Sequence, residues 1–404
     1  MAGFSAPAAP AATTSATASA AGPALTAASS TAPAAASLAL HALFDAAWQD
    51  SMRRYPEWAT FVAGPYAAAA PTAGNLSGFP GGAAAYAQAA RSQTTTDLDP
   101  AQIHAIGLRE VARLRGEIDR VMRDMAWTDD FASFVQQLYS DPQYDLPSND
   151  ALLAAYCDIG KRLDPELPKL FAELPRAPWG VRAIPADVGL DAAENYSGPA
   201  LDGSRPGWFS ANAAGYKNRP SWGMGTLVAH EAVPSHQLQT ARAVELGELP
   251  RFRRSGGYVA YSESWALYAE TLGFQLGLYK DPARRFGHLQ MQMLRAARLL
   301  VDSGLHQLGW THQQAIDCLL AQSGMNRGFV ESEVDRYTSW PGQALGYLVG
   351  RFKIIALRDR ARAALGLRFD IRRFHMAVLD QGAVPLSVLD RQIDDWIAGE
   401  QARP

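Results

Sequence analysis

Apolar residues recur with a helical period over most of the chain beyond residue 37, which predicts a mainly helical protein. Helices are expected over residues 38–54, 101–125, 150–174, 224–246, 258–278, 282–305, 311–323, 331–337, 342–365 and 385–398. One of these segments carries an apolar stripe with the i, i+4, i+7 and i+11 spacing of a single helix face, made up of Tyr261, Trp265, Tyr268 and Leu272. We expect this stripe to pack into the core.

Strand signals are few in this sequence. Residues 180–185 and 208–213 are short apolar segments bounded by Pro or Gly, and both precede the expected helix 224–246. They predict a small accessory sheet beside that helix.

Composition and charge exclude several classes of partner. The 404 residues carry a formal net charge of -3, with charges spread along the chain, so we expect no nucleic-acid or membrane partner. No apolar run approaches the roughly 20 residues of a membrane-spanning helix.

Two distant cysteines, Cys157 and Cys318, are expected to be small buried hydrophobes.

The N-terminal residues 1–37 are almost wholly Ala, Ser, Thr, Pro and Gly, with no Lys or Arg. This composition predicts a disordered tail. It argues against a secretory signal, which normally begins with basic residues. A cytoplasmic location is therefore favoured. Export remains the alternative, because sites of the A-x-A type are frequent in the tail.

An adjacent His–Glu pair, His230 and Glu231, lies inside an apolar, helix-forming segment. In metallopeptidases such a His binds zinc, and the neighbouring Glu takes a proton from the metal-bound water. The common H-E-x-x-H spacing is absent, because Pro234 is the fourth residue after His230 and His236 is the sixth. On an ideal helix His236 would point about 120° away from His230, so a kink or bulge at Pro234 is needed. An ordinary polar pair on a half-buried helix is the alternative.

An acidic residue in the next apolar helix strengthens the metal interpretation. Glu263 lies about 30 residues beyond the His–Glu pair, and a buried Glu needs a partner such as a cation. Two His and one Glu leave a fourth position for water, which is typical of catalytic zinc. Glu270 shares the face of Glu263 and is expected either to orient a ligand histidine or to form a surface salt bridge.

Several motifs occur in the same order as in the bacterial DUF885 family, which is grouped with the gluzincin-type zinc peptidases. They lie at residues 103–110, 202–207, 230–234, 263–268, 298–306, 336–337, 341–347 and 374–375. The chain resembles this family over about three quarters of its length. The resemblance implies a multi-helix, gluzincin-type catalytic fold with a small accessory β-sheet. It also implies His230, His236 and Glu263 as ligands of one Zn²⁺, with Glu231 as general base.

The same resemblance suggests residues that stabilise a tetrahedral oxyanion. These candidates are Arg336, Tyr337, Tyr347 and His306. Helix capping by His306 and simple packing by Tyr337 are the alternatives, and the motif residues Arg298 and Asp302 could form a plain i, i+4 pair. The remaining histidines singled out are interpreted as structural: His104, His288, His312 and His375.

The sequence departs from the family pattern at three positions. Ser235 and Ser264 replace glycines, and Gln237 replaces a histidine. If either glycine position required a positive φ, serine would strain it and could shift a ligand. The N-terminal part also resembles a shortened version of the family's, with a loop or shortened connection at residues 64–82.

These observations predict a tail at 1–37, an abbreviated helical lobe at 38–145 and a metallopeptidase-like catalytic region at 146–404. The expected function is a zinc-dependent hydrolase that cleaves a peptide or a small amide. A further interpretation keeps the metal but recruits the altered pocket to a specialised amide or ester. The cleft is expected to be either open or closed by a second subunit in a homodimer. The alternative is a degenerate, non-hydrolytic protein that binds a small molecule or a partner. Motifs of serine hydrolases and nucleotide-binding proteins are absent from the sequence.

Overall fold

The computed structural model describes residues 74–185, 189–190, 192–247, 249, 253 and 257–403. Asn75–Pro404 form one compact unit. The predicted tail 1–37, the predicted helix 38–54 and the first part of the predicted loop 64–82 lie outside the described residues. Among the helices that are described, none is both long and apolar enough to cross a membrane.

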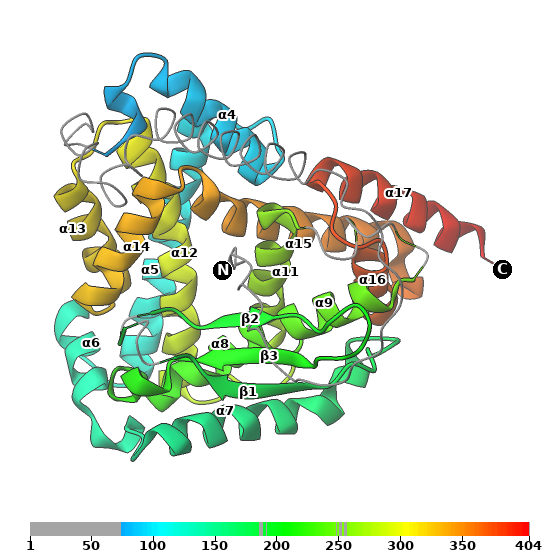
Figure 1. The fold of residues 1–404 in the computed structure, drawn as a ribbon, viewed down its shortest axis with the longest axis horizontal. Helices are drawn as coiled ribbons and strands as arrows, with labels where there is room; N and C mark the ends of the chain where they lie inside the picture. The colour runs from blue at the N-terminus through cyan, green and yellow to red at the C-terminus, as the bar shows by residue number, and fades with distance from the viewer. Residues whose placement is uncertain are drawn as a thin grey trace, which may run out of the picture. The chain divides into compact units, whose positions relative to one another are not determined.

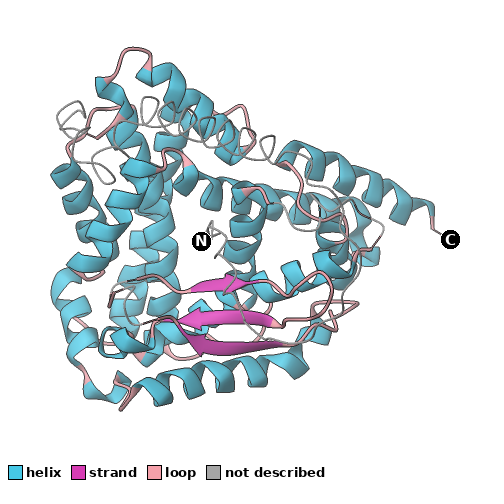
Figure 2. Ribbon diagram, in the orientation of Figure 1, coloured by secondary structure: helices cyan, strands magenta, loops and turns pink. Residues whose placement is uncertain are grey.

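Helices dominate this unit, and a small three-stranded sheet lies among them (Figures 1 and 2). The helices are α4 (Gly82–Thr94), α5 (Pro100–Asp124), α6 (Phe131–Ser140), α7 (Asn149–Leu163), α8 (Ser221–Glu231), α9 (His236–Glu245), α11 (Val259–Leu272), α12 (Pro282–His306), α13 (His312–Ser323), α14 (Arg327–Ser339), α15 (Gly346–Leu365), α16 (Ile371–Leu379) and α17 (Leu386–Ala402). The prediction of a mainly helical protein with a small accessory sheet is confirmed.

The sheet has the strand order β1–β3–β2, with β1 (Trp179–Ala183) parallel and β2 (Asn195–Ser197) antiparallel to β3 (Gly207–Ala211). The two predicted strands correspond to β1 and β3. β2 was not predicted, because three residues are too few to show an alternating pattern. Helix α7 lies along β1, as Figure 1 shows.

Helices α5 and α12 are the two longest described helices, and they pack against each other along their length. Each begins at an Asp–Pro step, where the Asp side chain accepts hydrogen bonds from the first-turn amides and Pro occupies the first helical position. These start signals explain why both helices were predicted to within a residue or two. Because α5 and α12 share an apolar core, residues on both sides of the predicted boundary at 145 pack together.

The prediction of one continuous helix over residues 224–246 is wrong. α8 ends at Glu231 and α9 begins at His236, and a cis peptide bond joins Val233 to Pro234 in between. A proline lacks the amide hydrogen that the helix needs at this position, and its ring clashes with the preceding turn. The chain therefore leaves the helix altogether instead of only bending.

Other differences concern short or weakly patterned helices. The helix predicted over 150–174 ends at Leu163, because Pro165 and Pro168 convert its continuation into a 3₁₀ segment. α4 was not predicted because its alanine-rich sequence has little contrast between faces, and α6 and α16 are short.

The aromatic stripe of α11 lies in the core as predicted, with Tyr261, Trp265, Tyr268 and Leu272 all buried. The cysteine prediction is wrong for Cys157, which is exposed on α7 directly after the buried Tyr156. Adjacent residues on a helix point about 100° apart, so Cys157 turns out of the core. Helix α11 itself is buried on nearly every side, which makes its two glutamates unusual.

Candidate metal centre

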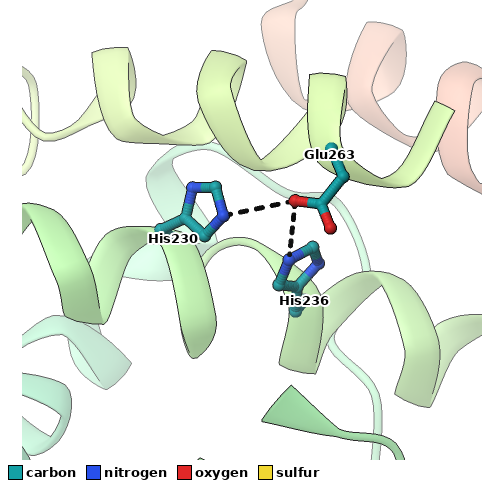
Figure 3. A group of neighbouring side chains, drawn as sticks. All are labelled: His230, His236 and Glu263. Atoms are coloured by element: carbon teal, nitrogen blue, oxygen red, sulfur yellow. Dashed lines mark ion pairs between the residues drawn. The ribbon is translucent and has the colours of Figure 1, made fainter. Parts of the chain in front are cut away.

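Three side chains from separate helices converge on one point (Figure 3). His230 lies at the end of α8, His236 is the first residue of α9, and Glu263 extends from α11. A Glu263 carboxylate oxygen lies 3.4 Å from Nε2 of His230 and 3.5 Å from Nε2 of His236. All three residues are buried, and their ligand atoms lie within 4.8 Å of one another. The structure thus brings together the three residues predicted as ligands.

These separations fit a metal better than direct hydrogen bonds. A charge-assisted N–H···O bond is about 2.7–2.9 Å long, which is shorter than either distance observed here. Ligand atoms about 2.0–2.2 Å from a tetrahedral zinc ion are about 3.3–3.5 Å apart, which matches both. The two imidazole rings lie nearly perpendicular, at 86°, with their centroids 5.1 Å apart. The donor set and its spacing therefore fit a zinc ion.

The break between α8 and α9 solves the orientation problem that the sequence posed. Because the two histidines lie on different helices, the 120° offset of a continuous helix does not apply to them. The indole Nε1 of Trp265 donates a hydrogen bond to the Pro234 carbonyl at 3.3 Å, which ties the break to α11. The same helix that carries Glu263 thus holds the turn that positions His236.

Glu270 contacts the ring nitrogen of His230 that faces away from the centre. Its carboxylate lies 2.7 Å from Nδ1 of His230, and the residue is fully buried. The Nδ1–H therefore donates to Glu270, which leaves the Nε2 lone pair directed to the centre. The surface salt bridge considered for Glu270 is wrong, because α11 is buried on this face. The orienting role expected for Glu270 agrees with this geometry.

Helix α12 supplies partners of Glu270 that sequence reasoning missed. The amide of Gln292 donates to the second Glu270 oxygen at 2.5 Å, and Arg295 lies 3.8 Å from the first. His288, interpreted as structural, stacks on Tyr279 and has its Nδ1 4.0 Å from Glu270. The sequence could have indicated this polar face, because His288, Gln292 and Arg295 follow the i, i+4, i+7 spacing of one helix face.

The local electrostatics favour a positive charge at this point. Burial opposes protonation of His230, yet the carboxylates of Glu263 and Glu270 raise its pKa above the ordinary value. A cation placed among the three side chains would satisfy the same carboxylates without a proton on the ring. The centre is therefore suited to a divalent metal ion.

The predicted general base, Glu231, follows His230 directly and is buried. Its Oε2 atom has no hydrogen-bond partner within the described part of the chain. A buried, unpaired carboxylate oxygen is costly unless a ligand or water uses it. This is the property required of a group that accepts a proton from a bound water.

Comparison with known proteins places the chain in a family. A family model described as a bacterial protein of unknown function (DUF885) matches residues 3–393. The chain belongs to the DUF885 family. No protein with a curated description matches it.

Two solved structures resemble this DUF885 protein. One is described as a putative lipoprotein from Colwellia psychrerythraea, with a TM-score of 0.79 and 37% identity over 82% of this chain and 58% of that one. The other, a putative lipoprotein of unknown function from Shewanella oneidensis, has a TM-score of 0.66 and 18% identity over 76% and 59% of the two chains, which shows a shared fold alone. This chain thus spans less than two thirds of either relative. Neither relative supports the cytoplasmic location expected from the sequence.

The three positions expected to depart from the family pattern show no positive φ in this DUF885 protein. Ser264 lies within helix α11, and Ser235 has a φ of -102°, so neither serine occupies the positive-φ region that would cause strain. The Ser264 hydroxyl donates to the carbonyls of Gly346 and Tyr347 at 2.8 and 2.9 Å. Gln237 donates to the Ala177 carbonyl at 3.2 Å, which engages its side chain near β1.

The residues predicted to stabilise an oxyanion form a second buried cluster around Glu333. Arg336 and Tyr337 both donate to the Glu333 carboxylate, and Arg336 also donates to Gln343. Among the described residues, the Tyr347 hydroxyl has one hydrogen-bond contact, a long one of 3.4 Å from the Gln343 amide. Of these side chains, Tyr347 therefore has the polar group that is least engaged by the protein.

His306, the fourth residue predicted for the oxyanion, has both ring nitrogens engaged inside the fold. Its Nδ1 accepts from the Leu76 amide at 3.1 Å, so its Nε2–H donates to the Tyr337 carbonyl at 3.0 Å. Burial lowers the pKa of His306 to about 4, which keeps it neutral. Neither nitrogen is available to an oxyanion in this arrangement.

Three of the histidines interpreted as structural have partners away from the centre. His104 contacts the Ser303 hydroxyl at 2.8 Å, and the exposed His312 pairs with Asp335. His375 is fully buried between the Leu170 carbonyl and the Tyr268 hydroxyl. These contacts agree with the structural interpretation of all three.

We expect Glu270→Gln to weaken zinc binding about 10- to 100-fold, because the amide can no longer hold the Nδ1–H of His230 as a carboxylate does. The measurement is competition for zinc against a chelator of known affinity. Glu333→Gln is the matched control, since Glu333 is also buried but belongs to the other cluster. Equal zinc affinity in Glu270→Gln and the wild type would contradict the orienting role.

Proposed function

We propose that this DUF885 protein is a zinc-dependent hydrolase of the gluzincin type that cleaves a peptide or a small amide. The observation that carries the proposal is the convergence of His230, His236 and Glu263 at the spacing of a zinc tetrahedron, with Glu270 holding His230 from behind. Three protein ligands leave a fourth position for water, as catalytic zinc requires.

The four residues have distinct roles in the proposed reaction. His230, His236 and Glu263 would hold the zinc ion, which supplies a Lewis acid and lowers the pKa of a bound water. The unpaired Glu231 carboxylate accepts the proton of the attacking water and then delivers it to the leaving amine. The burial of all four side chains strengthens their electrostatic effect on a bound substrate.

Tyr347 is the best candidate to donate a hydrogen bond to the developing oxyanion. Its hydroxyl is only loosely engaged, whereas Arg336 and Tyr337 are occupied by Glu333. Its backbone carbonyl accepts from Ser264, the residue after the ligand Glu263. This contact joins the start of α15 to the metal centre on α11.

A non-hydrolytic binding protein was the alternative from the sequence, because of Ser235, Gln237 and Ser264. Neither serine has a positive φ, and the Gln237 amide donates to the Ala177 carbonyl. No contact in the described part of the chain specifically favours this alternative, and it stays a prediction that the hydrolysis assay decides.

The test combines zinc content per chain with hydrolysis of a mixed library of peptides and small amides by the apo and the zinc-loaded protein. Zinc-dependent cleavage of any library member supports the proposal. Bound zinc without cleavage of peptides or small amides would overturn the hydrolase and support the binding protein.

We also propose that the protein acts outside the cytoplasm. The support is that the solved relative at 37% identity is described as a putative lipoprotein. Fractionation of the native host, with antibody detection, is expected to place the protein in an extracytoplasmic fraction. Its recovery with cytoplasmic markers alone would overturn this location.

A further inference from the structure

Two arginines of α12 are buried with hydrogen-bonding capacity left over. Arg295 and Arg298 are 4% and 5% exposed. Nε of Arg295 and Nη1 of Arg298 have no hydrogen-bond partner among the residues that the structure describes. Three residues apart, they lie on one side of the helix. Unused donors on buried cations are costly, and they indicate that a ligand completes the site.

The nearby carboxylates do not balance these charges. Glu333 is shared by Arg298 and Arg336, so one carboxylate serves two guanidinium groups. Glu270 lies near Arg295, but it already accepts from His230 and Gln292. The cluster around Glu333 therefore has a surplus of positive charge.

A third buried carboxyl, that of Asp302 on α12, compensates this surplus only in part. It accepts from the Tyr86 hydroxyl at 2.6 Å and from the Gly342 amide at 3.1 Å. Burial raises the pKa of Asp302 to about 7, so it is only partly ionised at neutral pH. An anion from outside the protein would complete the balance.

The position of this cluster connects it to the reaction site. The Arg298 guanidinium lies over the Tyr347 ring, 4.6 Å from its centroid, and Tyr347 is joined through Ser264 to the segment that carries Glu263. Arg295 lies 3.8 Å from Glu270, the residue that orients His230. Arg295 is thus linked to the ligand His230 through Glu270, and Arg298 packs on the ring of the proposed oxyanion donor.

We propose that Arg295 and Arg298 form a subsite for a carboxylate group of the substrate. This inference rests on the proposed hydrolase and deepens it, because it restricts the substrate to peptides or amides with a carboxylate near the scissile bond. Arginine suits this role because its planar fork matches the two oxygens of a carboxylate. The carboxylate is either the C-terminus of a short peptide or an acidic side chain.

The test is a calorimetric comparison of three ligands on the zinc-loaded Glu231→Gln variant, which binds without turnover. The ligands are N-acetyl-Ala-Ala, its C-terminal amide, and N-acetyl-Ala-Glu amide. We expect a peptide with a carboxylate to bind about 10- to 100-fold more tightly than the uncharged amide, as the loss of a charged hydrogen bond predicts. Preference for the first ligand identifies a C-terminal carboxylate, and preference for the third identifies an acidic side chain.

Variants then locate the binding group. Arg298→Gln is expected to remove the preference, and Arg327→Gln, on the exposed face of α14, is the control that keeps it. Arg298→Lys retains the charge if the glutamine variant fails to fold, and it is expected to reduce the preference because it lacks the fork.

Equal binding of all three ligands to the protein with intact arginines would overturn the subsite whatever the variants do. The same titrations on the apo protein separate the two proposals, because the arginines do not need the metal. A protein that takes up no zinc but prefers carboxylates would disprove the hydrolase alone. A zinc hydrolase without this preference would disprove the subsite alone.

Discussion

Glu231→Gln is expected to lower the rate of hydrolysis about 10²- to 10⁴-fold, the range typical for loss of a general base. The amide has nearly the same shape as the carboxylate but cannot accept the proton of the attacking water. Zinc content should stay at the wild-type level, because the ligands are His230, His236 and Glu263. The measurement is kcat and zinc per chain on the same preparation.

The control for this variant is Glu331→Gln, which makes the same change at a surface position of α14 paired with Arg327. It is expected to leave both rate and zinc content unchanged. A Glu231→Gln variant with wild-type kcat would show that the proton goes to another group. Loss of zinc in the same variant would instead show that Glu231 is a ligand.

His230→Ala and Glu263→Ala are each expected to reduce zinc from about one ion per chain to almost none after dialysis. Each change removes one of only three protein ligands, and each leaves a buried partner unpaired. The measurement is mass spectrometry of metal content at fixed free zinc. Because histidine and carboxylate accept several first-row metals, the wild type should also be challenged with manganese and cobalt.

His312→Ala is the matched control, since His312 is exposed and pairs with Asp335 at a distance from the centre. It should retain the wild-type zinc content. Full zinc occupancy in Glu263→Ala would place the metal elsewhere. A wild-type protein that takes up no zinc or other divalent ion would overturn the proposed hydrolase.

The sequence predicted the long helices well because their signals are local. Asp99–Pro100 and Asp281–Pro282 mark the starts of α5 and α12 on their own. The break after Glu231 was underestimated, because a proline signals a disturbance of the helix but not its size. Strand β2 depends on pairing with β3, a contact distant in sequence that no local pattern reveals.

The site was predictable to the extent that its residues are unusual where they stand. A glutamate in an apolar helix and an adjacent His–Glu pair sufficed to select Glu263, His230 and Glu231. The role of Glu270 was left open between two possibilities, because burial of the whole helix cannot be read from its own sequence. The cluster around Glu333 joins α12 to α14, and its assembly depends on tertiary packing alone.

The turn between α8 and α9 changes what evolution can vary at this centre. When two ligands lie on one helix, they must be separated in sequence by about a whole number of helical turns in order to face the same ion. Here the spacing is set by a turn that Trp265 holds at the Pro234 carbonyl. We expect residue identity to vary in such a turn, since Ser235 has no positive φ that would require glycine, whereas its length is fixed. Insertions or deletions between Glu231 and His236 should therefore be rarer among functional relatives than substitutions.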